Sequence, residues 1–177
     1  MDDLPTLSNS KLVHQGYFDL RIDTLARKNG TAGCYTVLLT KVNATAILTE
    51  DTKGRLILTR EYRHPIQQYV LSCPGGRIEP SEDSVAAARR ELLEETGYVA
   101  TKFHFLANYF PLPSICDQKI SLFFAKGAKK TCRQKLDPLE VIELVIFKKE
   151  ELLQEIRRGA LIDGVLSAAL FYKGLLE

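Results

Sequence analysis

The stretch Gly75–Tyr98, GGRIEPSEDSVAAARRELLEETGY, organises the interpretation of the whole chain. Its second half is predicted to be a helix. Residues 80–83 (PSED) are start signals, and acidic residues at this end face the positive end of the helix dipole. Gly97 is a typical residue for the position just after a helix. We therefore expect one helix that follows a Gly-Gly loop and ends at Gly97.

Three glutamates gather on or beside one face of this helix. Glu91 and Glu95 are four residues apart, Glu94 flanks them, and Arg90 can pair with Glu94. Carboxylates this close repel one another unless a cation neutralises them, and Mg²⁺ binds oxygen ligands together with substrate phosphates. The Gly-Gly loop lets the backbone approach a ligand closely. This combination suggests metal-assisted attack on a phosphate chain, whereas the alternative interpretation is a solvated acidic face.

The order of residues in this stretch resembles the Nudix box, G-x5-E-x7-R-E-U-x-E-E-x-G-U, where U is bulky and apolar. Gly76, Glu82 and the run Arg90–Tyr98 match the fixed positions. Tyr98 is aromatic where an aliphatic residue is usual, a difference that concerns packing and not chemistry. The resemblance implies an α/β/α sandwich and the hydrolysis of a nucleoside diphosphate linked to another group.

The flanking sequence resembles the ADP-ribose pyrophosphatase subfamily. The run 56–65 (LILTREYRHP) is similar to a strand of that subfamily whose arginine, at the position of Arg63, contacts a substrate phosphate. A guanidinium binds phosphate oxygens bidentately and stays charged. Pro113 lies fifteen residues beyond the box, where the subfamily has a marker proline, but the loop PLPSICDQ departs from the usual P-S-P-G-F-S-D-E. The resemblance implies these substrate-binding residues: Arg60, Arg63, Gly76, Pro113 and Gln118.

The resemblance also implies how the box works. It assigns the metal ligands to Glu91, Glu94, Glu95 and the carbonyl of Gly75, with Mg²⁺ as the cofactor and Mn²⁺ as an alternative ion. The same three glutamates and Glu140 are the expected catalytic residues. Glu140 is the candidate general base, the alternative being an exposed loop glutamate. Glu82 and Arg90 are expected to hold the loop and the helix together.

Composition bounds these expectations. The chain has 177 residues, enough for one domain with a sizeable core, and is 45% hydrophobic and 26% charged. Its net charge of +2 offers no case for nucleic acid or a membrane surface as a partner. Four widely spaced cysteines without a CxxC pattern predict reduced thiols in a cytoplasmic protein. No apolar run is long enough to span a bilayer.

Hydrophobic periodicity and turn signals predict the remaining elements. A loose start over residues 1–9 precedes a strand over 11–25, which forms a hairpin with a strand over 35–40. Further strands are expected over 45–48, 56–59, 69–72, 119–125 and 141–147, a basic turn over 126–135, and helices over 149–158 and from Asp163 to about 175. This order predicts an α+β fold with a mixed central sheet, helices on its faces and an N-terminal antiparallel strand region.

These observations lead to one functional hypothesis and its alternatives. Residues 1–177 are expected to form a single domain, with about 1–42 used in a homodimer and about 43–177 as the catalytic core. Tyr17, Phe18 and Tyr35 would either stack on a base or pack on the sheet. The expected activity is Mg²⁺-dependent hydrolysis of ADP-ribose or a related nucleoside-diphosphate sugar. The alternatives are GDP-mannose, NADH or a dinucleoside polyphosphate as substrate, or a nucleotide-sensing module that does not cleave.

Overall fold

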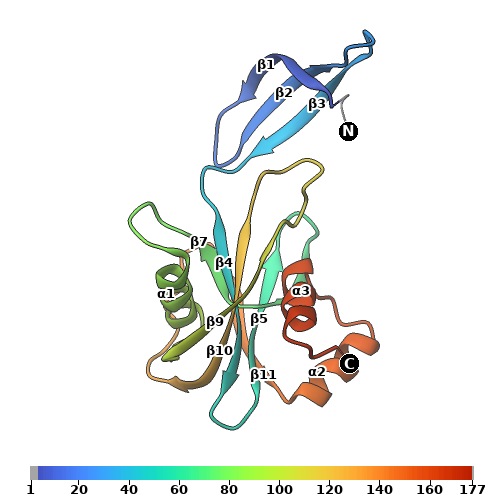
Figure 1. Cartoon of the computed structure of the whole chain (residues 1–177). Coiled ribbons are helices and arrows are strands. Elements are labelled where there is room, and N and C mark those ends of the chain that lie inside the picture. The colour runs from blue at the N-terminus through green and yellow to red at the C-terminus, as the bar shows by residue number, and fades with distance from the viewer. Residues whose placement is uncertain (1–3, 177) are drawn as a thin grey trace. The chain divides into compact units, whose positions relative to one another are not determined.

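The computed structural model describes residues 4–176, which divide into two compact units. The first contains the residues up to Asn43 together with Phe110–Lys119, and the second contains Ala44–Tyr109 and the residues from Ile120 onward. The catalytic core expected from the sequence was one continuous segment from about residue 43 to residue 177. Instead, residues 110–119 join the N-terminal strands, because the backbone N–H of Leu38 donates to the carbonyl of Ile115 at 2.7 Å. Figure 1 labels the elements of both units.

The first unit is built on an antiparallel sheet in the order β1-β2-β3, with β1 at Thr6–His14, β2 at Asp19–Ala26 and β3 at Ala32–Leu39. The hairpin of β2 and β3 closes around residues 27–31, where the N–H of Arg27 donates to the carbonyl of Thr31 at 2.8 Å. The predicted N-terminal antiparallel region and its hairpin are therefore confirmed.

Two expectations for these strands are wrong. The loose start was expected to reach Asn9, but β1 begins at Thr6; residues 1–3 lie outside the described part. All of β1 is exposed, so it lacks the hydrophobic alternation that marks a strand, and its backbone ladder with β2 holds it in place. The predicted strand over 11–25 is also broken after His14, where the N–H of Gly16 donates to the carboxylate of Asp19 at 3.2 Å.

Within residues 4–176, the second unit contains a mixed eight-stranded sheet. Its main path runs β11-β5-β4-β10-β8, with β6 paired to β5, β7 to β4 and β9 to β10. β4 and β10 are parallel and the other pairs are antiparallel. The strand bounds are β4 Ala44–Asp51, β5 Leu56–Arg63, β6 Gln68–Ser72, β7 Gly75–Arg77, β8 Tyr98–Val99, β9 Lys102–Tyr109, β10 Ile120–Lys130 and β11 Ile142–Phe147.

Helices cover both faces of this sheet, as Figure 1 shows. α1 (Ser84–Thr96) packs Ala88 and Leu92 onto one face, where Ile47 and Ile57 lie. α2 (Lys149–Arg157) and α3 (Gly164–Tyr172) pack on the other face against a second apolar cluster that includes Leu48 and Leu58. Because neighbouring residues of a strand point to opposite faces, each central strand contributes to both clusters. The predicted α/β/α sandwich is confirmed.

The basic segment after residue 125 was expected to be a turn, and this expectation is wrong for its first half. β10 continues to Lys130, and its last residues pair with β8, Lys129 opposite Val99 and Lys130 opposite Tyr98. A bulge between Lys126 and Ala128 lets the strand bend while Ala128 stays buried. The partner strand, β8, directly follows α1 in the sequence and is therefore distant from Lys129 and Lys130 along the chain. The residues around these lysines gave no indication of the pairing.

No helix formed by residues 4–176 has the length and apolar character needed to cross a membrane. The four cysteines are free thiols, and Cys73 is the buried one among them.

Candidate active site

Hydrogen bonds at both ends define the helix that carries the three box glutamates. Asp83 is the N-cap, and its Oδ1 accepts from the backbone N–H groups of Val85 at 3.0 Å and Ala86 at 2.8 Å. Gly97 ends α1 with a φ of 73°, and its N–H donates to the carbonyl of Leu93 at 2.8 Å. The predicted helix and its glycine end are confirmed.

The Gly-Gly loop is the short strand β7, and its backbone lies against two of the helix carboxylates. The N–H of Gly75 donates to Oε2 of Glu95 at 2.9 Å. A Cβ at Gly75 would lie 2.7 Å from the Cα of Ala46, and a Cβ at Gly76 would lie 2.5 Å from Oε1 of Glu91. Glycine at position 75 therefore lets the chain pass this close to β4, and glycine at position 76 leaves room for the Glu91 carboxylate.

Arg90 joins the loop and the helix. Its guanidinium contacts the carboxylates of Glu82 at 2.6 Å, Glu91 at 2.8 Å and Glu94 at 3.0 Å. It also donates to the carbonyl of Arg77 at 2.9 Å. The predicted pairing of Arg90 with Glu94 is confirmed, and the contacts with Glu82 and Arg77 tie the start of the box to the middle of the helix.

Burial and mutual repulsion raise the pKa of two box carboxylates. Glu95 is only 5% exposed; burial raises its pKa well above the usual value, and the charge of Glu61 adds to this effect. Burial also raises the pKa of Glu91, against the opposing influence of Arg90. The ionised cluster is therefore unfavourable unless positive charge approaches it.

Burial is the main cause of the raised pKa values of Glu61, Glu91 and Glu95, and the charge of Glu140 adds a smaller increase to each, so Glu140 lies within electrostatic range of this cluster. It occupies an exposed loop before β11, where its Oε2 accepts from the backbone N–H of Asp137 at 2.9 Å. The structure thus brings the predicted candidate base into the neighbourhood of the box.

Glu61 is a site residue that the sequence interpretation missed. It is 6% exposed on β5, and its carboxylate accepts from the hydroxyl of Thr59 at 2.8 Å and pairs with Arg63 at 2.7 Å. Burial raises its pKa, and the charge of Arg63 opposes the shift. The available signal was strand alternation, which places Ile57, Thr59 and Glu61 on the face that α1 covers.

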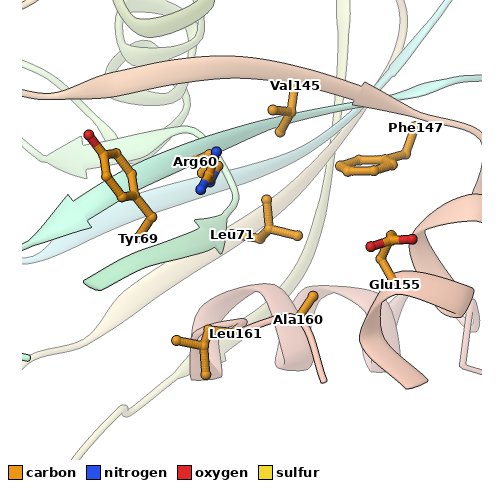
Figure 2. A pocket seen from close by; sticks show the side chains of 8 residues that line it. All are labelled: Arg60, Tyr69, Leu71, Val145, Phe147, Glu155, Ala160 and Leu161. Carbon is orange, nitrogen blue, oxygen red and sulfur yellow. The ribbon is translucent and has the colours of Figure 1, made fainter. Parts of the chain in front are cut away.

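The same alternation separates Arg60 from Arg63. Arg60 points to the opposite face of β5 into a pocket of about 350 Å³, drawn in Figure 2. There its guanidinium lies 4.8 Å from the centroid of the Tyr69 ring and 3.2 Å from the carboxylate of Glu143. The remaining lining residues come from β6, β11, α2 and the α2–α3 connection: Leu71, Val145, Phe147, Glu155, Ala160 and Leu161. Of the two predicted substrate arginines, Arg63 is the one on the face that carries the box.

Pro113 and Gln118 belong to the first unit, in the segment that binds β3. The N–H of Gln118 donates to Sγ of Cys116 at 3.4 Å, and Oδ1 of Asp117 accepts from the N–H of Thr40 at 2.7 Å. These contacts give the segment its shape within the first unit.

A segment after β10 closes over the end of α1. The N–H of Thr131 donates to the carbonyl of Gly97 at 2.8 Å, Nε2 of Gln134 to that of Glu95 at 2.6 Å, and the N–H of Lys135 to that of Glu94 at 2.8 Å. These donors satisfy carbonyl groups that a helix end leaves unpaired.

The donor set of the box fits a hard divalent cation. In residues 4–176 no three Asp, Glu, His or Cys side chains are arranged as a group that could hold a metal ion. Glu91 and Glu94 instead pair with Arg90, and Glu95 accepts from Gly75. Oxygen donors that are buried and electrostatically unfavourable when ionised are nevertheless suited to Mg²⁺ or Mn²⁺, whose charge would offset their repulsion.

Comparisons with known proteins agree with this arrangement. A family model for the NUDIX domain matches residues 40–168. The chain is 27% identical to a methanol dehydrogenase activator from Bacillus methanolicus and 25% identical to an ADP-ribose pyrophosphatase from Bacillus subtilis strain 168; each match covers 97% of this chain and 93% of the relative. A solved structure described as an ADP compounds hydrolase superposes with a TM-score of 0.81 at 26% identity, covering 96% of this chain and 92% of the other.

Proposed function

The chain belongs to the Nudix family of hydrolases, and we propose that it cleaves the diphosphate of ADP-ribose or a related nucleoside-diphosphate sugar. With ADP-ribose, water would be added across the diphosphate to give AMP and ribose 5-phosphate. The observation that carries the proposal is the position of Glu95 and Glu91 against the backbone of Gly75 and Gly76, with Arg63 on the same face of β5.

The proposed cofactor is Mg²⁺, with Mn²⁺ as an alternative. Glu91, Glu94, Glu95 and the carbonyl of Gly75 would hold it, and when bound it supplies a Lewis acid that lowers the pKa of water and offsets phosphate charge. The N–H of Gly75 orients the Glu95 carboxylate, and Arg90 orients those of Glu91 and Glu94.

The remaining roles follow from position. Arg63 would bind a phosphate oxygen of the substrate, because a guanidinium remains charged and offers paired donors. Glu140 would accept the proton of the attacking water, since it lies in a loop within electrostatic range of the box. Gly76 keeps the space in front of Glu91 open. Pro113 and Gln118 remain proposed substrate contacts on the resemblance alone. The resemblance also implies Arg60, but we do not include it in the proposed site, because its side chain lines the pocket on the opposite face of β5.

A substrate panel tests the proposal. The protein is incubated with Mg²⁺ and ADP-ribose, GDP-mannose, UDP-glucose, NADH or diadenosine polyphosphates, and the products are identified by chromatography. Preferred cleavage of ADP-ribose to AMP and ribose 5-phosphate supports it. Preference for another compound would reassign the substrate, and no cleavage of any of them would favour a nucleotide-sensing module.

A second candidate function comes from the relative in Bacillus methanolicus, which is named for activating methanol dehydrogenase. Its match extends over nearly all of both chains. If this protein shares that role, adding it to a purified methanol dehydrogenase would raise the dehydrogenase rate. The matched control is the Glu95→Gln variant, which separates activation that needs the box from activation by binding alone.

We also propose a cytoplasmic homodimer in which the first unit supplies the interface and the second unit is the catalytic core. Large apolar side chains on the β1–β3 sheet and the β1–β2 turn are exposed: Leu7, Leu12, Val13, Tyr17, Phe18, Ile22 and Tyr35. Exposed apolar surface of this kind is typical of protein interfaces. The cytoplasmic location is proposed because the protein has four free thiols, which suit a reducing compartment. Light scattering during size-exclusion chromatography would give a mass near twice 19.9 kDa.

A further inference from the structure

Glu61 is a buried carboxylate that none of the roles above uses. Its side chain is 8% exposed, and an ionised carboxylate in such a place is costly unless it is paired and hydrogen-bonded. Both of its oxygens have partners: Oε1 accepts from the Thr59 hydroxyl at 2.8 Å, and Oε2 lies 2.7 Å from Nη2 of Arg63. The group is therefore held in one orientation by two neighbours from its own strand.

The two partners of Glu61 differ in their access to solvent. Thr59 is fully buried, and its hydroxyl also lies 3.3 Å from the carbonyl of Ser72 on β6. The Arg63 side chain is 49% exposed. Glu61 thus connects a fixed point inside the sheet to a guanidinium at the surface.

The guanidinium of Arg63 has donors left for an anion. A guanidinium carries five N–H donors in a fixed plane, and the pair with Glu61 engages Nη2. An ion pair on one edge of the plane limits the rotation of a long side chain, so less conformational freedom is lost when the other edge binds a phosphate.

We propose that Glu61 is a positioning residue, anchored by Thr59, that holds Arg63 on the catalytic face of β5 so that its free edge receives a substrate phosphate. The proposal rests on the proposed function for the identity of the ligand. It makes a prediction opposite to simple electrostatics. Removing a negative charge should strengthen the binding of an anion, whereas removing the group that orients Arg63 should weaken it.

The experiment is a double-mutant cycle of Glu61→Gln and Arg63→Gln, with inorganic pyrophosphate as the probe in titration calorimetry, with and without Mg²⁺. We expect Glu61→Gln alone to weaken pyrophosphate binding about tenfold, because a neutral amide oxygen holds the guanidinium less firmly than a carboxylate does, by about the difference between a neutral and a charge-assisted hydrogen bond. In the Arg63→Gln background the same change should leave the affinity unchanged or improve it. With ADP-ribose and Mg²⁺, Glu61→Gln should raise KM about tenfold with kcat within about twofold.

A matched control comes from Glu143 on β11, which lies opposite Arg60 of β5. Glu143 pairs with Arg60 as Glu61 pairs with Arg63, but both members of this pair are exposed. Glu143→Gln should leave pyrophosphate affinity unchanged, which shows that the effect belongs to the catalytic face.

Three results would overturn the proposal. If Glu61→Gln binds pyrophosphate more tightly both with Arg63 present and in the Arg63→Gln variant, Glu61 acts only by repelling the anion. If it binds pyrophosphate more weakly by the same factor in both, Glu61 does not act through Arg63. No pyrophosphate binding by the unaltered protein under either condition would also reject it. If thermal melting shows that Glu61→Gln does not fold, Thr59→Val takes its place, because it is almost isosteric and removes the hydroxyl that anchors Glu61. Thr59→Val should weaken pyrophosphate binding about threefold when Arg63 is present and should have no effect in the Arg63→Gln variant.

The pyrophosphate titration does not depend on which nucleotide is cleaved. If the substrate panel fails while the cycle behaves as expected, the proposed function is wrong and the role of Glu61 stands. If ADP-ribose is cleaved but the cycle shows no coupling, the role of Glu61 is wrong and the function stands.

Discussion

Gly76 lies so close to Glu91 that a Cβ at this position would be 2.5 Å from the carboxylate oxygen Oε1. The neighbouring glycine is constrained differently, because a Cβ at Gly75 would meet backbone atoms of Thr45 and Ala46. A flexible carboxylate can turn away, whereas a strand backbone cannot. Gly75 and Gly76 therefore serve different purposes: Gly76 leaves room for a carboxylate of the site, and Gly75 allows the close approach of two strands.

Alanine substitutions should separate these purposes. Gly76→Ala should displace the Glu91 carboxylate and lower kcat by about 100-fold, while the free energy of unfolding changes by less than about 1 kcal/mol. Gly75→Ala should cost about 2–3 kcal/mol of stability, because the strand must shift. Urea unfolding and steady-state kinetics on both variants check this. Equal losses of stability would contradict the distinction.

Neutralising the most buried box carboxylate should affect activity and stability in opposite directions. Glu95→Gln keeps an oxygen that can accept from the N–H of Gly75 but removes a buried charge. We expect kcat to fall by at least about 100-fold, while the melting temperature in EDTA at pH 8 stays the same or rises. Glu150→Gln, at an exposed position of α2, is the control and should change neither quantity. Retained activity of Glu95→Gln would remove this residue from the proposed mechanism.

Arg90 should contribute to stability far more than an ordinary surface arginine. It contacts three carboxylates and one carbonyl group, so Arg90→Ala leaves several partly buried acceptors unpaired. The expected loss is about 1–3 kcal/mol in urea unfolding, and Arg90→Lys should recover little of it because an ammonium cannot reproduce the planar contacts. The exposed pair of Arg158 with Glu155 provides the comparison, since Arg158→Ala should cost less than about 0.5 kcal/mol.

The stability of the metal-free protein should fall as the pH rises. The pKa values of Glu91 and Glu95 in the folded state lie above the ordinary 4.5, so between these values the folded state binds more protons than the unfolded state. Stability is therefore highest below about pH 4.5 for these two groups and is lost as the pH passes through the raised values. The pKa of Asp51 is lowered because hydrogen bonds from Arg55 and Lys53 outweigh its burial, so its contribution is lost only below pH 3.8.

Mg²⁺ should reverse this loss, since it binds the ionised carboxylates. At about 100 times its dissociation constant the ion should raise the melting temperature by about 5–10 °C at pH 8 and by much less at pH 5. Melting curves in EDTA and in Mg²⁺ at the two pH values measure the difference. A shift of the same size at both would show that the ion binds elsewhere, and Glu95→Gln should reduce the shift at pH 8.

Local sequence was sufficient for some features and insufficient for others. The caps of α1 and the pairing of Arg90 with Glu94 depend on residues within one or two helix turns, so spacing alone predicted them. Glu61 was missed because its burial depends on partners from several elements: Thr59 and Arg63 in its own strand, and α1 above it. Strand alternation places Arg60 and Arg63 on opposite faces of β5, but which of the two faces carries α1 became known only from the packing of Ala88 and Leu92 against Ile57.

Strand ends were missed for a related reason. The polar side of β1 and the lysines at the end of β10 are exposed, so neither shows the apolar alternation on which the prediction depends. Their backbone partners, β2 and β8, hold them extended. The grouping of residues 110–119 with the N-terminal strands likewise comes from hydrogen bonds to residues at the end of β3, which lie far from this segment in the sequence.

The closure of residues 131–135 over the end of α1 has a consequence for motion. The last turn of an isolated helix frays readily, yet here the carbonyl groups of Glu94, Glu95 and Gly97 accept hydrogen bonds from a segment that follows β10 in the sequence. The turn that carries two box glutamates cannot open unless that segment is released with it. The amide protons of the last turn of α1 and of residues 131–135 should then exchange with solvent at one common rate, as a single cooperative unit.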